Sequence, residues 1–133
     1  MGGGSLVVMS RPPADVVRTF FTSMQGRDWA AAAECLAADV RIWWPATDER
    51  FRGAAFLAMQ RAYPDGWEIE VVEVLAAGDR VSARVAVVLD GDRYWCFGSY
   101  QVREGAIADG VELWGTQGAD TPPAWRARFT DGG

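Results

Sequence analysis

The sequence predicts an α+β fold in which a cone-shaped, curved and mainly antiparallel sheet wraps around N-terminal helices. Apolar residues recur at helical spacing over residues 16–24, whereas residues 67–114 form four long runs whose side chains alternate between two faces. Helices that come first and antiparallel strands that come after are typical of an α+β arrangement with the helices on one face of the sheet. The open end of such a cone is a natural site for a small molecule.

Three helices and one short strand are expected in the first half of the chain, over residues 10–25, 29–38, 54–62 and 40–44. Ser10 provides a capping hydroxyl for the first helix, prolines follow in its first turn, and Gly26 ends it. Asp28 can cap the second helix, which is rich in alanine. The short strand ends at Pro45, because proline has no backbone N–H for a neighbouring strand, and residues 46–52 are expected to form a polar loop.

Four long strands are expected to follow, over residues 67–76, 80–90, 92–102 and 106–114. Short turns that contain glycine and acidic residues separate them, as is typical of an antiparallel meander. The second of these strands has one wholly apolar face, made of Val81, Ala83, Val85, Val87 and Leu89. The third has two faces, and neither of them is suited to water.

The composition indicates a single domain, residues 10–133, preceded by a flexible tail over residues 1–9. Half of the residues are apolar, as expected of a globular chain. The net charge is −5 and no cluster of basic residues occurs along the sequence, so nucleic acid and anionic membranes are poor partners. All thirteen basic residues are Arg, which we attribute to a GC-rich bacterial genome.

The cysteines and the N-terminal sequence favour a cytoplasmic location. Cys35 and Cys96 are too few for a disulfide framework and do not form a C-x-x-C motif, which fits a reducing compartment. The N-terminus has neither the basic region nor the long apolar run of a signal peptide. No segment approaches the length of a membrane span.

This order of elements resembles the nuclear-transport-factor-2-like superfamily, and within it the SnoaL-like group. The segments that carry the resemblance are residues 18–20, 26–29, 38–40, 51–53, 78–81 and 103–107. Residues 112–114 and 123–126 are similar to the "EYW … PAWR" ending of many bacterial members. The resemblance covers residues 12–129 and implies a cystatin-like α+β barrel. It does not select a function, because the superfamily contains isomerases, cyclases, dehydratases, epoxide hydrolases and non-catalytic modules.

Three enzyme subgroups of the superfamily need residues that this chain lacks. The ketosteroid isomerase subgroup has a carboxylate base just before the proline that ends the first strand, where this chain has Trp44. The positions of that subgroup's oxyanion hole hold Thr19 or Phe20 and Gly98 or Ser99. The scytalone dehydratase subgroup relies on His, which is absent here. The limonene epoxide hydrolase subgroup uses Arg-x-Asp, and no Arg of this chain is followed two places later by an acid.

The SnoaL-type polyketide cyclase pattern remains, in which one acidic residue on the last strands moves a proton. Such chemistry needs a carboxylate in a dry wall, because desolvation raises its pKa toward neutrality. Glu112 and Asp109 are the candidates, and alternation from Trp114 points Glu112 inward and Asp109 outward. The alternative is that Glu112 forms an ion pair with an Arg of a neighbouring strand, or faces outward in a different register.

We expect a pocket inside the cone, lined by Phe20, Trp44, Val85, Phe97, Glu112 and Trp114. Trp44, Trp95 and Trp114 offer large rigid surfaces on which a flat aromatic ligand can stack, although such residues are more often part of the core. Ser99 and Gln101 can hydrogen-bond a ligand carbonyl, or can equally face solvent. The charged loop over residues 48–52 either rims this pocket or is simply solvated.

Two functions are consistent with these residues. The first is an enzyme that binds a hydrophobic cyclic or aromatic molecule and uses Glu112 for proton transfer, as a cyclase or isomerase without a metal or organic cofactor. The second is a non-catalytic ligand-binding or dimerisation module of the same fold. The position of Glu112 separates them, because an enzyme needs it buried beside a cavity rather than paired on the surface.

A homodimer is expected to form through the outer face of the sheet. We assign to this face two neighbouring strands, with Tyr94, Cys96, Tyr100 and Val102 on one and Val111 and Leu113 on the next. The preceding strand extends it through Ser82, Arg84, Ala86 and Val88. In the competing arrangement the C-terminal tail, with Trp125 and Phe129, folds back over this face.

Overall fold

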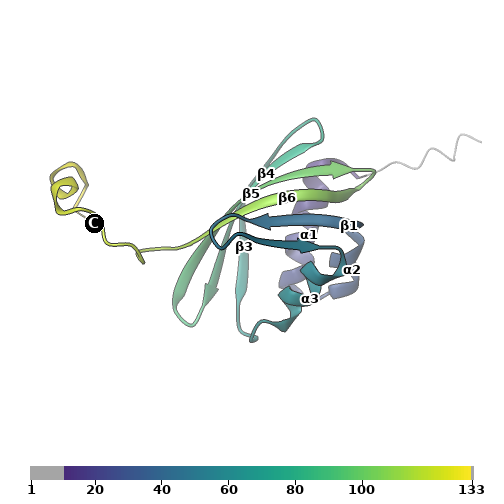
Figure 1. The fold of residues 1–133 in the computed structure, drawn as a ribbon, viewed down its shortest axis with the longest axis horizontal. Coiled ribbons are helices and arrows are strands. Elements are labelled where there is room, and N and C mark those ends of the chain that lie inside the picture. Colours follow the sequence, from purple (N-terminus) through teal and green to yellow (C-terminus); the bar gives the residue numbers. More distant parts are fainter. Residues whose placement is uncertain (1–10, 133) are drawn as a thin grey trace, which may run out of the picture.

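The structure is a computed structural model and describes residues 11–132 (Figure 1). The predicted flexible tail, residues 1–9, and the predicted capping residue Ser10 lie outside the described residues. The elements in chain order are α1 (Pro13–Gln25), α2 (Trp29–Glu34), β1 (Leu36–Trp44), β2 (Glu49–Arg52), α3 (Ala54–Ala62), β3 (Glu68–Ala77), β4 (Arg80–Leu89), β5 (Asp92–Arg103), β6 (Ala106–Thr116) and the 3-10 helix η2 (Ala124–Phe129).

The strands form one six-stranded sheet in the order β2-β1-β6-β5-β4-β3. Neighbouring strands are antiparallel except for β1 and β6, which are parallel. The helices α1, α2 and α3 gather on one side of this curved sheet, and α1 packs against β3, β4, β5 and β6 (Figure 1). The predicted α+β fold is confirmed. Because β2 and β3 are the two edges of the sheet, the barrel is not closed.

The core lies between α1 and the inner face of the sheet. The stripe predicted for the first helix is buried, with every member at most 3% exposed: Val16, Val17, Phe20, Phe21 and Met24. Burying one large apolar side chain contributes about 1.5–3 kcal/mol. A helix of 13 residues is marginal by itself, so this stripe is what stabilises α1.

Two local differences from the sequence prediction lie between α2 and α3. The second helix ends at Glu34, and β1 begins at Leu36, because Leu36 pairs with Ile107 of β6. The segment predicted as a polar loop contains β2, which forms a hairpin with β1. Asp48 has φ 56° in the turn between the two strands, a conformation that Asp tolerates better than most residues.

The two faces of β5 are reversed relative to the prediction. Tyr100 and Cys96 are at most 1% exposed and point toward the helices, whereas Phe97 on the outer face is 56% exposed. The predicted outer-face set of Tyr94, Cys96, Tyr100 and Val102 is therefore wrong in its orientation. The predicted inward orientation of the alternate set, Trp95, Phe97, Ser99 and Gln101, is wrong for the same reason.

Pairing with β6 decides which face of β5 is buried. Gly98 lies opposite Glu112 and Tyr100 lies opposite Gly110, so the even-numbered residues of these segments share the inner face. A Cβ at Gly110 would come within 2.6 Å of the Tyr100 ring, and a Cβ at Gly98 would overlap its hydroxyl. The two glycines therefore create the space that one large buried ring fills.

Arg27 joins the end of α1 to the start of β3. Its guanidinium donates to the carbonyl oxygens of Met24 and Gln25 at 3.2 and 3.1 Å, and to that of Trp67 at 2.6 Å. It also pairs with the exposed carboxylate of Asp65 and lies 3.4 Å from the centroid of the Trp67 ring. A cation suits the carbonyl end of a helix, so this single side chain links the end of α1 to the segment that leads into β3.

The segment after β6 leaves the domain and does not return to it in Figure 1. It ends in η2, where Trp125 and Phe129 are each 67% exposed. The arrangement in which the tail folds back over the sheet is therefore contradicted for this copy of the chain. We refer to residues 117–132 as the C-terminal arm.

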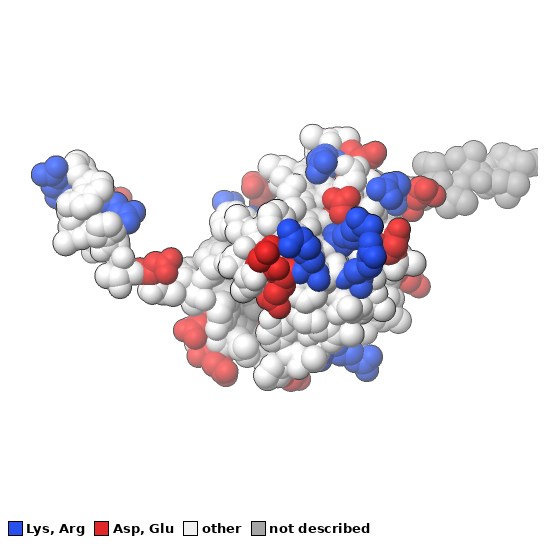
Figure 2. All heavy atoms as spheres, in the orientation of Figure 1, with Lys and Arg blue, Asp and Glu red and all other residues white. Residues whose placement is uncertain are grey.

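The surface carries charges of both signs. Figure 2 shows basic side chains gathered over β1 and β2, with acidic side chains next to them. Arg41 and Arg52 are exposed cross-strand partners on β1 and β2. Cys35 and Cys96 are both free and buried. None of the helices formed by residues 11–132 has the length and apolar character needed to cross a membrane.

Candidate functional site

Glu112 is a buried carboxylate on the inner face of β6, where it is 1% exposed. Its Oε1 accepts a hydrogen bond from Trp44 Nε1 at 2.8 Å, and its Oε2 accepts one from the Tyr100 hydroxyl at 2.5 Å. None of the ion pairs found among residues 11–132 involves Glu112. The inward orientation predicted from the alternation is thus observed, and the alternatives of an Arg ion pair or an outward register are wrong.

The sheet topology brings these three side chains together. Trp44 ends β1, which runs parallel to β6 with Trp43 beside Val111, so the next residue of each strand faces inward at the same level. Tyr100 reaches Glu112 from β5 across the space left by Gly98. Trp44 occupies the place where the ketosteroid isomerase subgroup is expected to have its base, and here it is a donor to the base candidate.

Burial raises the pKa of Glu112 above the ordinary value of a glutamate, because the charged form loses its hydration. Hydrogen bonds from Tyr100 and Trp44, and the nearby indole N–H of Trp114, favour the carboxylate and oppose this rise without cancelling it. Burial, followed by the nearby carboxylate, raises the pKa of Tyr100 well above its usual range. Tyr100 therefore stays protonated as a donor, and Glu112 is the member of the pair that can gain or lose a proton.

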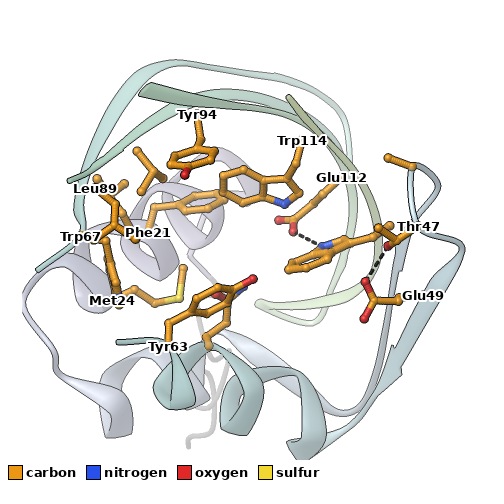
Figure 3. A pocket seen from close by; sticks show the side chains of 15 residues that line it. Phe21, Met24, Thr47, Glu49, Tyr63, Trp67, Leu89, Tyr94, Glu112 and Trp114 are labelled. Atoms are coloured by element: carbon orange, nitrogen blue, oxygen red, sulfur yellow. Dashed lines mark hydrogen bonds between the residues drawn. The ribbon is translucent and has the colours of Figure 1, made fainter. Parts of the chain in front are cut away.

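The indole N–H of Trp114 lies close enough to Glu112 to favour the carboxylate and lower its pKa, but it completes no hydrogen bond with it. This Nε1–H is buried and has no hydrogen-bond partner within the described part of the chain. The indole packs edge-on against Trp44, with ring centroids 6.0 Å apart, and its nitrogen lies on the side of Glu112 (Figure 3). An unpaired buried N–H costs about 1–3 kcal/mol, so a ligand oxygen that accepted this hydrogen bond would recover that cost.

A cavity of about 410 Å³ opens beside Glu112 (Figure 3). Its volume lies within the range of about 300–1,000 Å³ that is usual for small-molecule sites. The apolar and aromatic side chains of the wall come from α1, the strands of the sheet, the β1–β2 turn and the residue before β3: Phe21, Met24, Trp44, Ala46, Trp67, Ile69, Val87, Leu89, Tyr94 and Trp114. The remaining lining residues besides Glu112 are polar and come from the β1–β2 turn, the start of β2 and the C-terminal end of α3: Thr47, Glu49, Gln60 and Tyr63.

The structure brings three of the residues predicted for the site to this cavity, namely Trp44, Glu112 and Trp114. Phe20 and Val85 also point inward, but they lie in the solid core at 1% and 0% exposure rather than in the cavity wall. The four remaining residues, all on β5, do not line the cavity: Trp95, Phe97, Ser99 and Gln101. Their positions follow from the reversal of the two faces of β5.

Several lining residues were not predicted from the sequence. Tyr94 was assigned to the opposite face, and Phe21 and Met24 belong to a stripe that reads only as core. Gln60 and Tyr63 carry no sequence signal of their own, because α3 can be oriented only once its packing is known. Glu49 lies in the charged segment that was expected either to rim the pocket or to be solvated, and it does line the cavity mouth while accepting a hydrogen bond from Thr47 at 2.6 Å.

The sequence matches one known protein family over most of its length. A model of the SnoaL-like domain matches residues 17–110, which is more than half of the chain. The chain belongs to the SnoaL-like domain family. The matched segment contains Trp44 and Tyr100, and ends two residues before Glu112. No curated protein sequence matches the chain.

The SnoaL-like chain is similar to several solved structures. One is a protein from Kribbella flavida DSM 17836 with the provisional name ketosteroid isomerase, at 29% identity and a TM-score of 0.82, with 90% of this chain and 87% of that one covered. Another, from Sinorhizobium meliloti, is provisionally named polyketide cyclase, with 25% identity, a TM-score of 0.63 and coverage of 74% and 93%. An NTF2-like protein of unknown function from Burkholderia xenovorans LB400 shares the fold, with 16% identity, a TM-score of 0.70 and coverage of 90% and 93%.

Proposed function

We propose that this SnoaL-like protein is an isomerase or cyclase that needs no cofactor and acts on a hydrophobic cyclic or aromatic substrate by proton transfer through Glu112. The observation that carries the proposal is a carboxylate with a raised pKa, buried beside an apolar cavity and free of any Arg partner among the described residues. A base with these properties can take up a proton at a pH closer to neutrality than an exposed glutamate can.

In the proposed reaction, a substrate ring lies in the aromatic cavity with a C–H bond next to a carbonyl directed at Glu112. The carboxylate removes the proton, the electron pair moves into the carbonyl to form an enolate, and the proton is returned to another carbon of the same substrate. Each carboxylate oxygen has a second lone pair, so it can accept the proton while it keeps its bond to Trp44 or Tyr100. The two donors hold the carboxylate in one orientation, which favours transfer.

The Nε1–H of Trp114, which completes no hydrogen bond within the described part of the chain, supports a carbonyl-bearing substrate in this proposal. Negative charge develops on the carbonyl oxygen during proton removal, and a preoriented donor in a dry site stabilises that charge. The names of two similar proteins, ketosteroid isomerase and polyketide cyclase, belong to reactions of carbonyl compounds. These names support the substrate class and do not identify the substrate.

The experiment is a comparison of Glu112→Gln with the native protein on a panel of cyclic β,γ-unsaturated ketones, which absorb more strongly in the ultraviolet once the double bond is conjugated. Glu112→Gln is expected to bind the same ketones, followed by the fluorescence of the Trp residues in the wall, and to lose turnover by at least about 100-fold. Glu49→Gln is the matched control, because Glu49 lines the mouth but is exposed. Equal turnover in native protein and Glu112→Gln would exclude the proposed role.

A second candidate is a non-catalytic ligand-binding module. It is favoured by one feature, namely that both oxygens of Glu112 are already hydrogen-bonded within the protein. In that case ligands quench the Trp fluorescence of native protein and of Glu112→Gln with equal affinity, and no member of the ketone panel is converted. The same two measurements therefore separate the candidates.

The proposal includes a homodimer formed through the outer face of the sheet. Val111 and Leu113 of β6 were expected on this face, whereas Phe97 of β5 and Trp43 of β1 take the place of the residues expected from β5. All four are at least 37% exposed on the outer face of the sheet. A contiguous apolar patch of this kind is typical of an interface. Light scattering at micromolar concentration tests it, with Phe97→Arg expected to give monomers because an unpaired charge is costly at an interface centre.

A further inference from the structure

The C-terminal arm is fixed to the domain only at its root. The backbone N–H of Gln117 donates to the carbonyl of Arg93 at 2.8 Å, and Trp95 Nε1 donates to the Gln117 side chain at 2.9 Å. Among residues 118–132, every hydrogen bond found for the arm is local or joins it to the end of β6. Figure 1 shows the arm directed away from the sheet. The arm therefore extends from the domain without packing on it.

The end of the arm carries side chains that are suited to burial. Trp125 and Phe129 are each 67% exposed and contact each other edge-on, with ring centroids 6.4 Å apart. Arg128 lies over the Phe129 ring at 4.6 Å. A 3-10 helix of six residues has little stability of its own, and two exposed aromatic rings on such a short element need a surface that covers them.

A groove on the outer face of the sheet offers that surface. It is lined by residues of β4, β5, β6 and the root of the arm: Arg84, Trp95, Phe97, Leu113, Trp114, Gly115, Thr116 and Gln117. Phe97 and Leu113 are cross-strand partners and are 56% and 51% exposed. The groove therefore has an apolar floor that the chain leaves uncovered.

One acidic side chain on the outer face beside the groove has no ion-pair partner among the described residues and can complement the arginines of the arm. Three exposed acids of β3, Glu68, Glu70 and Glu73, stand on the outer face, since their partners on β4 are the outward residues Val88, Ala86 and Arg84. Arg93 and Arg84 pair with two of them, and Glu68 forms no ion pair with any residue in the described range. The arm brings two further Arg residues, at 126 and 128, next to its aromatic pair.

We propose that the arm of one copy seats Trp125 and Phe129 in the outer-face groove of a second copy, so that two arms are exchanged across the dimer. A second copy is the occupant because the arm points away from the groove of its own domain (Figure 1). The seven residues 117–123, which include two prolines, span about 20 Å when extended at about 3.1 Å per residue, which reaches across an interface. A two-fold axis then makes the two arms equivalent and closes the assembly.

The arm exchange rests on the proposed dimer, and disulfide trapping tests the exchange separately from dimer formation. Gly115→Cys places a thiol in the groove at a position where a Cβ meets open space, and Ala127→Cys places one between the aromatic residues of the arm. The two single variants are mixed and oxidised, and a disulfide-linked pair of chains is expected. Arg61→Cys on α3 replaces Gly115→Cys in the control mixture, because it is exposed and lies on a helix rather than in the groove.

Two outcomes of trapping overturn the inference. A linked pair no more abundant than in the Arg61→Cys mixture shows that the arm does not reach the partner's groove. An intrachain disulfide in a chain that carries both Gly115→Cys and Ala127→Cys, without linked pairs, shows that the arm covers its own domain. The native thiols of Cys35 and Cys96 are buried and so do not compete.

Truncation after Gly118 provides the independent measurement. Loss of the arm, or the double substitution Trp125→Ala and Phe129→Ala, is expected to raise the dimer dissociation constant at least about tenfold, because central aromatic anchors contribute most of an interface. Thr121→Ala, an exposed arm residue, is the matched control and leaves the constant unchanged. A truncated chain that dimerises as well as the full chain overturns the arm exchange and leaves the sheet-to-sheet dimer in place. A native chain that is monomeric overturns both.

Discussion

Removal of the Tyr100 hydroxyl tests the electrostatics of the site most directly. Tyr100→Phe deletes the donor that lies 2.5 Å from Glu112 Oε2 and retains the ring that fills the space over Gly98 and Gly110. Because this hydrogen bond favours the charged carboxylate, its loss raises the pKa of Glu112 beyond the rise that burial already causes.

The size of the effect follows from the strength of the bond. A hydrogen bond to a charged group contributes about 1.5–3 kcal/mol, and one pKa unit corresponds to about 1.4 kcal/mol. The pKa of Glu112 is therefore expected to rise further in Tyr100→Phe. The full strength of the bond is an upper limit for the effect, because a protonated Glu112 also hydrogen-bonds the phenol.

The change in pKa has a consequence for stability. In the unfolded chain Glu112 loses its proton near pH 4.3, and in the folded protein it does so at higher pH because its pKa is raised. Between these two values the unfolded state binds fewer protons, so the free energy of unfolding falls as pH rises. Tyr100→Phe extends this window upward. Its destabilisation relative to the native protein should be up to about 3 kcal/mol larger at pH 8 than at pH 5.

Two measurements check this prediction. A 13C NMR titration of the glutamate carboxyl groups, assigned with Glu112→Gln, gives the pKa, and urea denaturation at pH 5 and pH 8 gives the stability. Tyr94→Phe is the control, because Tyr94 lines the same cavity and has no hydrogen bond to Glu112. A pKa that stays constant or falls, or a destabilisation equal at both pH values, would refute the reasoning.

Three further substitutions have defined outcomes. Gly98→Ala should destabilise the protein by roughly 3 kcal/mol because its Cβ overlaps the Tyr100 hydroxyl, whereas Gly115→Ala, which meets open space, should change the unfolding free energy by less than about 0.5 kcal/mol. Arg27→Met should lower the free energy of unfolding, measured by urea denaturation, by about 2 kcal/mol, because three backbone carbonyls lose their hydrogen-bond donor. Asp65→Asn is the control, since it alters only the exposed ion pair, and an equal effect of the two substitutions would contradict this reasoning. Trp114→Phe should weaken binding of a cyclic ketone about fivefold to tenfold in fluorescence titration, and equal weakening for the parent hydrocarbon would show that the free N–H is not used.

Much of the fold could be predicted because the relevant patterns are local. The stripe of α1 and the alternation of the four long strands are each visible within a dozen residues, and together they specify helices on one face of a sheet. The inward position of Glu112 follows from the same alternation, because Trp114 and Glu112 are two residues apart on one strand. The alternation gave the correct face for β4 and β6.

The orientation of β5 could not be predicted in this way. Both of its faces carry aromatic residues, so alternation defines two sets without saying which one is buried. The choice depends on the pairing of Gly98 and Gly110 with Glu112 and Tyr100, and a β-bulge after Gln101 interrupts the register near the turn. The position of the arm could not be predicted either. Trp125 and Phe129 are aromatic and suggest burial, but the sequence does not show whether their own domain or another molecule covers them.

The β1–β2 hairpin contributes residues to both the inner end and the mouth of the cavity. Trp44 contacts Glu112 at the inner end, and three residues later Thr47 begins the polar mouth with Glu49. The intervening turn is mostly exposed and lies outside the buried core and away from the carboxylate of Glu112. Its length and composition can therefore change while Glu112 and its hydrogen-bond donors stay in place. A library confined to residues 45–49 would vary the entrance of the cavity and leave its inner end unchanged.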